Sequence, residues 1–129
     1  MDTSTDAIDR WFAAFATQLT PGHELTPPSR RLAQQTLLAR LARGDVVART
    51  EEGRWAYLPR PRGALLHYVG GEELAIAKPE AKLAQVLCGA RRFDGRALAT
   101  RAKSAAARAL IVRLFAMGAL RFAGRASAR

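Results

Sequence analysis

Apolar residues recur every three or four positions near the N-terminus, which is the spacing of one face of a helix. We therefore expect a helix from about residue 6 to residue 19, ended by Thr20-Pro21-Gly22. Three aromatic rings are many for so short a stripe. The stripe either packs on its own domain or forms a dimer seam with a second chain. The candidate interface residues on it are Ile8, Trp11, Phe12 and Phe15.

A second helical pattern spans residues 29–43, with Ser29 as its expected N-cap and Gly44 just after its end. The apolar period then changes to two, which is typical of strands. Residues 46–50 and 54–58 are expected to pair as a hairpin, because only a short turn of two glutamates and a glycine lies between them.

Another hairpin is expected from residues 65–69 and 73–76, since Gly70 and Gly71 lie between them. Two adjacent glycines favour a tight turn because glycine reaches positive φ without steric cost. The sequence thus predicts a small antiparallel sheet in the middle of the chain.

Helical patterns dominate the C-terminal third of the chain. The expected elements are helices over 79–88, 95–101 and 105–117, followed by a strand over 120–122. Asp94 and Ser104 are the expected N-caps of the last two helices. Helix, short helix, turn, helix and strand follow one another in this order in a winged-helix unit. A wing hairpin after the last helix is missing or reduced to one strand, which could pair with residues 74–76 instead.

The predicted fold class is α+β, with a helical N-terminal segment, a small antiparallel sheet and a C-terminal winged-helix (helix-turn-helix) unit. The expected boundaries are an N-terminal helix and linker over 1–28, a winged-helix-like domain over 29–124 and a flexible tail over 125–129. A chain of 129 residues can bury a sizeable core without a disulfide or a metal. The single cysteine, Cys88, is expected to be a buried small apolar residue and fits a reducing cytoplasm.

The net charge of +10 is unevenly distributed along the chain. Residues 1–28 have a net charge of −3, and residues 29–129 have a net charge of +13. A field of that sign attracts polyanions such as RNA, DNA or acidic protein surfaces. However, 18 of the 21 basic residues are Arg and alanine is abundant, a bias that a GC-rich genome also produces. A merely solvated basic surface is therefore the alternative.

Basic residues around the last two helices are the candidate contacts for nucleic acid. Alanines occupy the start of the last helix, where base-reading side chains would be needed. These alanines, expected on its exposed face, are Ala105, Ala106, Ala107 and Ala109. We therefore expect contact with phosphates without sequence reading. The candidate residues are Arg91, Arg92, Arg96, Arg101, Lys103, Arg108 and Arg113.

Several stretches of the chain resemble one known family. They are the hairpin Tyr68-Val69-Gly70-Gly71-Glu72, the helical stretches 83–88 and 94–101, and the segment 110–122, which ends in Gly118-Ala119-Leu120-Arg121-Phe122. Over about residues 29–122 the chain resembles the C-terminal winged-helix region of bacterial JmjC-type ribosomal oxygenases, which are ribosomal protein arginine hydroxylase-like enzymes. The resemblance implies the winged-helix fold and an accessory role.

The catalytic part of that family is a cupin barrel, which holds iron through a His-x-Asp pair and a distant His and uses 2-oxoglutarate. Neither His23 nor His67 is followed by an Asp at the second position after it. The resemblance therefore implies no activity for this chain alone. We expect either a separated C-terminal piece or a stand-alone relative that lacks the oxygenase.

No converging metal ligands, catalytic triad or phosphate-binding glycine motif is visible in the sequence. We therefore expect no catalytic residue and no cofactor. The leading hypothesis is a non-catalytic docking module that contacts RNA, DNA or a ribosomal protein through a basic C-terminal face. The alternatives are a pure protein-interaction or dimerisation module and an accessory domain of a 2-oxoglutarate oxygenase. A cytoplasmic location, a homodimer and no membrane partner complete these expectations.

Overall fold

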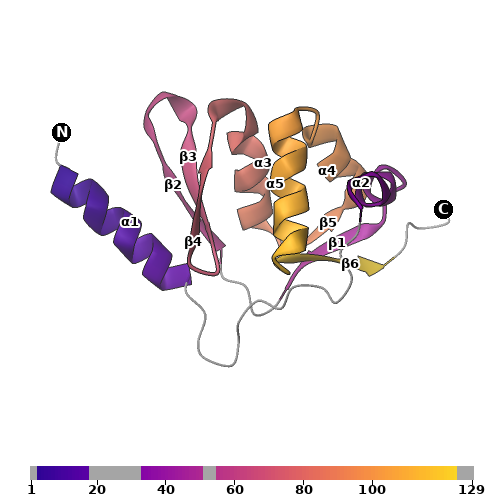
Figure 1. Cartoon of the computed structure of the whole chain (residues 1–129), viewed down its shortest axis with the longest axis horizontal. Helices are drawn as coiled ribbons and strands as arrows, with labels where there is room; N and C mark the ends of the chain where they lie inside the picture. Colours follow the sequence, from indigo (N-terminus) through magenta and orange to yellow (C-terminus); the bar gives the residue numbers. More distant parts are fainter. Residues whose placement is uncertain (1–2, 18–32, 51–54, 125–129) are drawn as a thin grey trace. The chain divides into compact units, whose positions relative to one another are not determined.

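The computed structural model describes the backbone of residues 3–17, 33–50 and 55–124 (Figure 1). Five α-helices and six strands lie in these ranges, so the predicted α+β class is confirmed. The chain divides into two compact units. Unit 1 comprises Met1–Leu25 and Glu51–Cys88, and unit 2 comprises Thr26–Thr50 and Gly89–Arg129.

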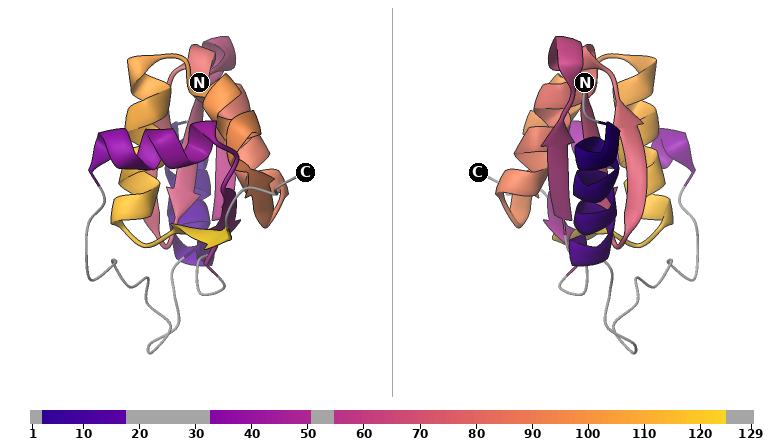
Figure 2. Two further views of the ribbon diagram at one scale, coloured as in Figure 1. Left: turned by 90° about the vertical axis from the view of Figure 1, so that its right-hand side faces the viewer. Right: turned by 90° about the vertical axis from the view of Figure 1, so that its left-hand side faces the viewer.

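Unit 1 is a three-stranded antiparallel sheet with a helix on one face. The strands β2 (Trp55–Pro59), β3 (Leu65–Val69) and β4 (Glu72–Ile76) pair in the order β2-β3-β4. Helix α1 (Thr3–Thr17) lies along this sheet, as the right-hand view of Figure 2 shows. The central strand β3 is buried at all of its positions. The unit also contains a short 3-10 helix over Pro61–Gly63 and most of helix α3 (Lys78–Gly89).

Small side chains of α1 make its contact with the sheet. Ala13 is buried in a cluster with Leu66 and Tyr68, and Ala14 packs at its edge. The guanidinium of Arg10 donates hydrogen bonds to both carboxylate oxygens of Glu73, and the hydroxyl of Tyr68 donates to the same carboxylate. Alanine allows close approach, and the polar contacts fix the helix along the strand.

Unit 2 is a second antiparallel sheet, with order β5-β1-β6, together with three helices. Its middle strand, β1, precedes the residues of the unit 1 sheet in the chain, whereas both outer strands follow them. Val47 of β1 pairs with Phe93 on one side and with Phe122 on the other. The ring of Phe122 lies 4.8 Å from that of Phe115 in α5, so this row faces the helices. The elements are α2 (Gln34–Ala42), β1 (Val46–Arg49), β5 (Arg92–Asp94), α4 (Gly95–Arg101), α5 (Ala105–Ala116) and β6 (Leu120–Gly124).

Local signals in the sequence are confirmed where side chains or glycines act on neighbouring residues. The Asp94 carboxylate accepts a hydrogen bond from the Arg96 amide, and the Ser104 hydroxyl oxygen accepts one from the Ala107 amide, so both predicted N-caps are present. The hairpin between β3 and β4 turns at Gly70, with φ of 57°, and Gly71, with φ of 85°. In the described chain α2 begins at Gln34, and the predicted cap Ser29 lies outside the described residues.

The predicted pairing of residues 46–50 with 54–58 is wrong. β1 pairs with β5 and β6, whereas β2 pairs with β3 in the other unit. The expectation that 120–122 pairs with 74–76 is wrong for the same reason, because β6 lies beside β1. Alternation of apolar and polar residues indicates a strand, but the partner depends on contacts that lie far apart in the sequence.

The order α3-β5-α4-α5-β6 along the chain is that of the predicted winged-helix unit, with one strand added. The added strand, β5, covers Arg92–Asp94, for which the sequence predicts no strand, because three residues are too few to show a period. Within the described residues no second strand follows β6 to form a wing hairpin, and β1 pairs with β6 instead. The predicted domain boundaries at residues 28 and 124 stay predictions, and the tail 125–129 lies outside the described residues.

Candidate polyanion-binding surface

The positive charge of the chain belongs to unit 2. Its residues include 15 basic and two acidic side chains, a net charge of +13. Unit 1 has six basic and nine acidic side chains, a net charge of −3. The net positive charge of the chain therefore comes from unit 2.

Both acids of unit 2 are engaged in the fold. The Asp45 carboxylate is fully buried and accepts 2.8 Å hydrogen bonds from Nε of Arg40, Nε of Arg43 and Nη2 of Arg43. These bonds and the charge of Asp45 raise the pKa of Arg43. A buried carboxylate is tolerated when it is paired in this way. Asp94 caps α4 and remains exposed, so of the two acids of unit 2 only Asp94 keeps its charge at the surface beside the exposed arginines.

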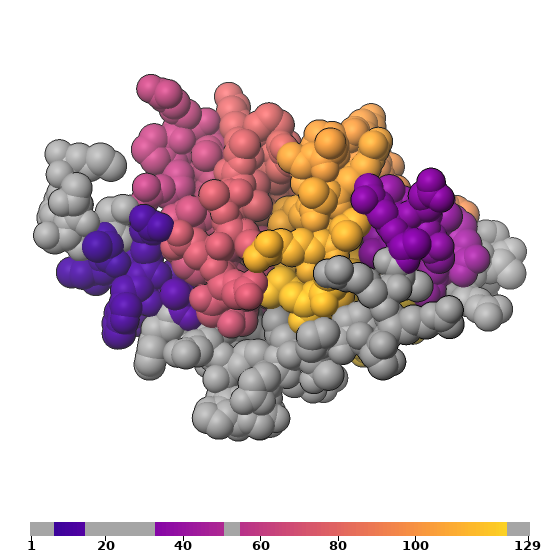
Figure 3. Space-filling view, in the orientation of Figure 1, coloured from indigo at the N-terminus to yellow at the C-terminus, as the bar shows by residue number. Residues whose placement is uncertain are grey.

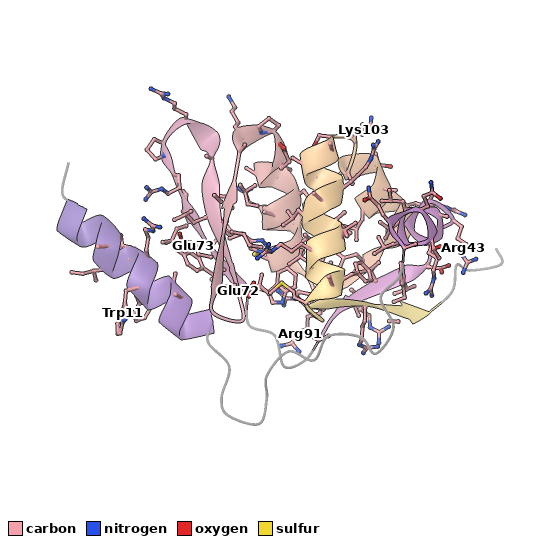
Figure 4. The ribbon with its side chains drawn as sticks, in the orientation of Figure 1. Trp11, Arg43, Glu72, Glu73, Arg91 and Lys103 are labelled. Atoms are coloured by element: carbon pink, nitrogen blue, oxygen red, sulfur yellow. The ribbon has the colours of Figure 1, made fainter. Side chains whose placement is uncertain are left out.

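One group of candidate contacts surrounds the turn between α4 and α5. Arg101, Lys103 and Arg108 are all exposed. Nε of Arg108 donates to the carbonyl of Ala102 at 3.1 Å, which holds the side chain of Arg108 against the turn. Lys103 lies at this end of α5 in Figure 4. The group can bind an anion beside the start of α5.

A second group lies on the β5-β1-β6 sheet. Arg91 and Arg92 are exposed at the start of β5, and Arg121 is exposed on β6. Arg92 and Arg121 both pair in register with Ala48 of β1, one from each side. Sequence reasoning missed Arg121, although the alternation Leu120-Arg121-Phe122 indicates that its side chain points away from the two apolar ones.

The seven predicted contacts are thus all exposed, but they do not form one patch. Arg91 and Lys103 lie toward opposite ends of α5 (Figure 4). Arg96 belongs to neither group, because its Nη2 donates to the Arg43 carbonyl at 3.3 Å beside α2. Arg113 is exposed in the last turn of α5. Whether any of the seven binds nucleic acid stays a prediction.

The exposed side of α5 carries methyl groups near its start. Ala105, Ala106 and Ala109 are exposed, whereas Ala107 is buried at 2% exposure, so its expected place on the exposed face is wrong. Figure 3 shows the outer side of α5 at the molecular surface. Methyl groups offer no hydrogen bond to a base edge, so this part of the helix is unsuited to reading sequence.

The aromatic stripe of α1 faces away from its own sheet. Ile8, Trp11 and Phe12 are 64%, 64% and 62% exposed, although each is large and apolar. Figure 4 shows Trp11 pointing away from the strands of unit 1. The side chain of Phe15, the fourth predicted interface residue, lies outside the described residues. The contact of α1 with its sheet instead uses Ala13 and Ala14.

The described histidine is buried in the sheet of unit 1. His67 is fully buried in β3, with its ring 5.3 Å from that of Trp55, and burial lowers its pKa to about 4. Among the described residues, no three His, Cys, Asp or Glu side chains gather where they could hold a metal ion. His23, the other histidine of the chain, lies outside the described residues.

Cys88, expected to be buried, is half-buried. In the part of the chain that is described, none of the helices is both long and apolar enough to cross a membrane.

A family model described as ROXA-like winged helix matches residues 1–121. Several solved structures are similar in fold, among them three of a ribosomal oxygenase, YcfD, from Escherichia coli. A crystal structure of that enzyme has a TM-score of 0.65, with 18% identity, and covers 88% of this chain and 29% of that chain. A second structure has a TM-score of 0.66, with 18% identity, and covers 92% and 31%. A third, in complex with cobalt and 2-oxoglutarate, has a TM-score of 0.63, with 19% identity, and covers 92% and 31%.

The chain therefore spans about 30% of the length of the solved proteins that it resembles. No curated protein matches it significantly in sequence. The winged-helix fold and the resemblance to ribosomal oxygenases, both predicted from the sequence, are confirmed.

Proposed function

Because the chain belongs to the ROXA-like winged helix family, we propose that it is a non-catalytic docking module, which binds a polyanion through the basic surface of unit 2. The observation that carries this proposal is the separation of charge. Unit 2 has a net charge of +13, and its two acids are used for a buried ion pair and a helix cap. The exposed arginines thus greatly outnumber the one exposed acid of unit 2, Asp94, and this excess of positive charge favours the binding of phosphates.

The similarity to ribosomal oxygenases favours RNA or a ribosomal protein as the partner. The solved proteins are ribosomal oxygenases, and a ribosome offers both phosphates and protein surfaces. This chain matches only their winged-helix part. The alternative role within this proposal is therefore that of an accessory domain, which acts beside a separate 2-oxoglutarate oxygenase that carries out the catalysis. A cytoplasmic location belongs to the same proposal.

Fluorescence anisotropy of the whole chain with a labelled RNA hairpin and a labelled DNA duplex tests the proposal. We expect binding at low salt, and an association constant that falls steeply as salt rises, because each phosphate contact releases condensed counterions. A wild-type chain that binds neither nucleic acid at low salt contradicts the proposal. Binding that is insensitive to salt contradicts it as well, since contact with phosphates is then not the source of affinity.

The exposed stripe on α1 supports a second candidate function, a protein-interaction module that forms a homodimer. Large apolar side chains at more than 60% exposure are unusual on a helix whose other side packs well. The candidate interface residues remain Ile8, Trp11, Phe12 and Phe15. The two candidates are compatible, because the stripe lies in unit 1 and the basic surface in unit 2.

A further inference from the structure

We propose that the face of the β5-β1-β6 sheet that carries Arg92 and Arg121 binds the phosphate backbone of double-helical RNA, with these two exposed arginines as a pair of phosphate contacts. This inference rests on the proposed function and names the surface and the ligand class within it. A winged helix suggests binding at the turn before α5, whereas we place the binding surface on the sheet.

The register of the sheet places the two arginines together. Residues directly opposite each other in an antiparallel pair have their side chains on the same face. Arg92 and Arg121 are both opposite Ala48, so the three form one row across the strands. Ala48 contributes only a methyl group to this row and is itself buried, so the exposed part of the row consists of the two arginine side chains that flank it.

The row faces away from the helices of unit 2. The neighbouring row, which consists of Phe93, Val47 and Phe122, has its side chains on the other face of the sheet. There the Phe122 ring contacts Phe115 of α5, and the guanidinium of Arg40 from α2 lies 3.9 Å from the centre of that ring. In Figure 1, β1 and β6 lie below the C-terminal end of α5. The face with Arg92 and Arg121 is therefore not used by those helices.

Charge and spacing suit a phosphate backbone. Two steps between strands place the Cα atoms of Arg92 and Arg121 about 10 Å apart, so both guanidinium groups can reach one phosphate or two neighbouring ones. Arg binds phosphate through a planar fork of N–H donors. Among the described residues, neither arginine side chain has a hydrogen bond or an ion pair. Asp94 is exposed on the same face of β5 and keeps its negative charge, but the net charge of unit 2 is +13.

The rest of unit 2 favours an RNA helix over a DNA duplex. A winged helix that reads DNA inserts its last helix into the major groove, but here Ala105, Ala106 and Ala109 occupy the exposed start of α5. In the described chain no wing hairpin follows β6. Double-helical RNA is recognised by its shape and its backbone, because side chains cannot read its deep and narrow major groove. A sheet face with two exposed arginines suits that kind of contact.

The test compares two double variants of equal charge in the whole chain. Arg92→Gln/Arg121→Gln removes the pair on the sheet, and Arg101→Gln/Lys103→Gln removes two charges at the turn before α5. Anisotropy titrations use an RNA hairpin, a DNA duplex of the same sequence, and polyglutamate as an acidic protein-like probe. Circular dichroism checks that each variant is folded. A third variant, Arg92→Lys/Arg121→Lys, keeps both charges but removes the planar sets of N–H donors of the two guanidinium groups.

We expect the dissociation constant for RNA to rise about tenfold or more in Arg92→Gln/Arg121→Gln, and about threefold or less in Arg101→Gln/Lys103→Gln. Arg92→Lys/Arg121→Lys should bind RNA with an affinity between those of the wild type and Arg92→Gln/Arg121→Gln. If the Gln variant does not fold, a loss of RNA affinity in the Lys variant tests the assignment to the sheet in its place. An equal or larger loss in the turn variant overturns the assignment to the sheet. Equal binding of DNA, or tighter binding of polyglutamate, overturns the assignment to RNA. If the wild type binds none of the three probes, the proposed function itself fails.

Discussion

The amide of Gly95 donates a 3.1 Å hydrogen bond to the carbonyl of Asp45, and the two residues touch so closely that a side chain cannot fit between them. A Cβ atom on Gly95 would lie 2.5 Å from that carbonyl oxygen and 2.9 Å from the carbonyl oxygen of Leu41. Gly95, the first residue of α4, thus packs directly against the backbone at the end of α2 and in the turn that leads to β1. This contact joins segments of unit 2 that lie far apart in the chain.

Gly95→Ala is expected to destabilise unit 2 by about 3 kcal/mol, because the added methyl group must displace backbone atoms. Urea unfolding followed by circular dichroism measures the effect. Gly89→Ala is the matched control: a Cβ there meets nothing within 4 Å, so its free energy of unfolding should change by less than about 0.5 kcal/mol. Equal stability of the two variants would contradict the close contact between Gly95 and Asp45.

Asp45→Asn is expected to lower the free energy of unfolding by about 2 kcal/mol, since a charged acceptor for Arg40 and Arg43 is lost inside the fold. The substitution keeps the shape of the side chain and removes its charge. Asp94→Asn is the comparison, because Asn caps a helix about as well as Asp does. It should leave stability nearly unchanged in the same urea titration, and a similar loss in both variants would argue against a special role for the buried carboxylate.

Much of the local structure could be predicted from the sequence because short-range chemistry decides it. Asp94 and Ser104 act on amides within three residues, and Gly70 and Gly71 supply the positive φ of the turn themselves. The pairing of β1 could not be predicted in this way. Its partners β5 and β6 lie beyond the whole unit 1 sheet in the chain, and nothing in Val46–Arg49 distinguishes them from the nearer β2.

The candidate polyanion-binding surface could likewise be predicted from the sequence only in part. The exposure of Arg91 and Lys103 was predictable, because charged side chains are rarely buried without a partner. Their separation toward opposite ends of α5 was not, since it depends on how the turn and the sheet are placed in three dimensions. Arg121 acquires its relation to Arg92 only through their shared partner Ala48, which no local pattern reveals.

His67 should make the stability of the protein depend on pH. The folded protein holds the ring neutral, with a pKa of about 4, whereas the ordinary pKa of His is 6.5. Below pH 6.5 the unfolded chain gains a proton that the folded chain does not, so acid favours unfolding. The free energy of unfolding should be fully retained above pH 6.5 and fall by up to about 3 kcal/mol as the pH approaches 4.

His67→Leu isolates this effect, because it removes the titrating ring and keeps an apolar side chain in the buried strand. Urea titrations across this pH range should show a nearly flat stability for the variant until carboxylates such as Glu73 begin to titrate. The pKa of Glu73 is lowered by its hydrogen bond from Arg10, so its contribution is lost only at more acid pH. The same slope in the variant and the wild type between pH 6.5 and 4 would rule out His67 as its source.

Trp11→Ala/Phe12→Ala is expected to abolish self-association while leaving the fold stable. Both rings are more than 60% exposed, so the chain loses little burial when they are removed, whereas a dimer seam would lose its largest anchors. Sedimentation velocity over a range of concentrations measures the association. Tyr57→Ala is the matched control, because Tyr57 is also a large exposed side chain of unit 1, at 39% exposure, but lies on β2. We expect wild type and Tyr57→Ala to shift toward a dimer as concentration rises, and the α1 variant to remain a monomer. A wild type that stays monomeric throughout, or an α1 variant that associates as the wild type does, would show that this stripe is not a seam between two copies.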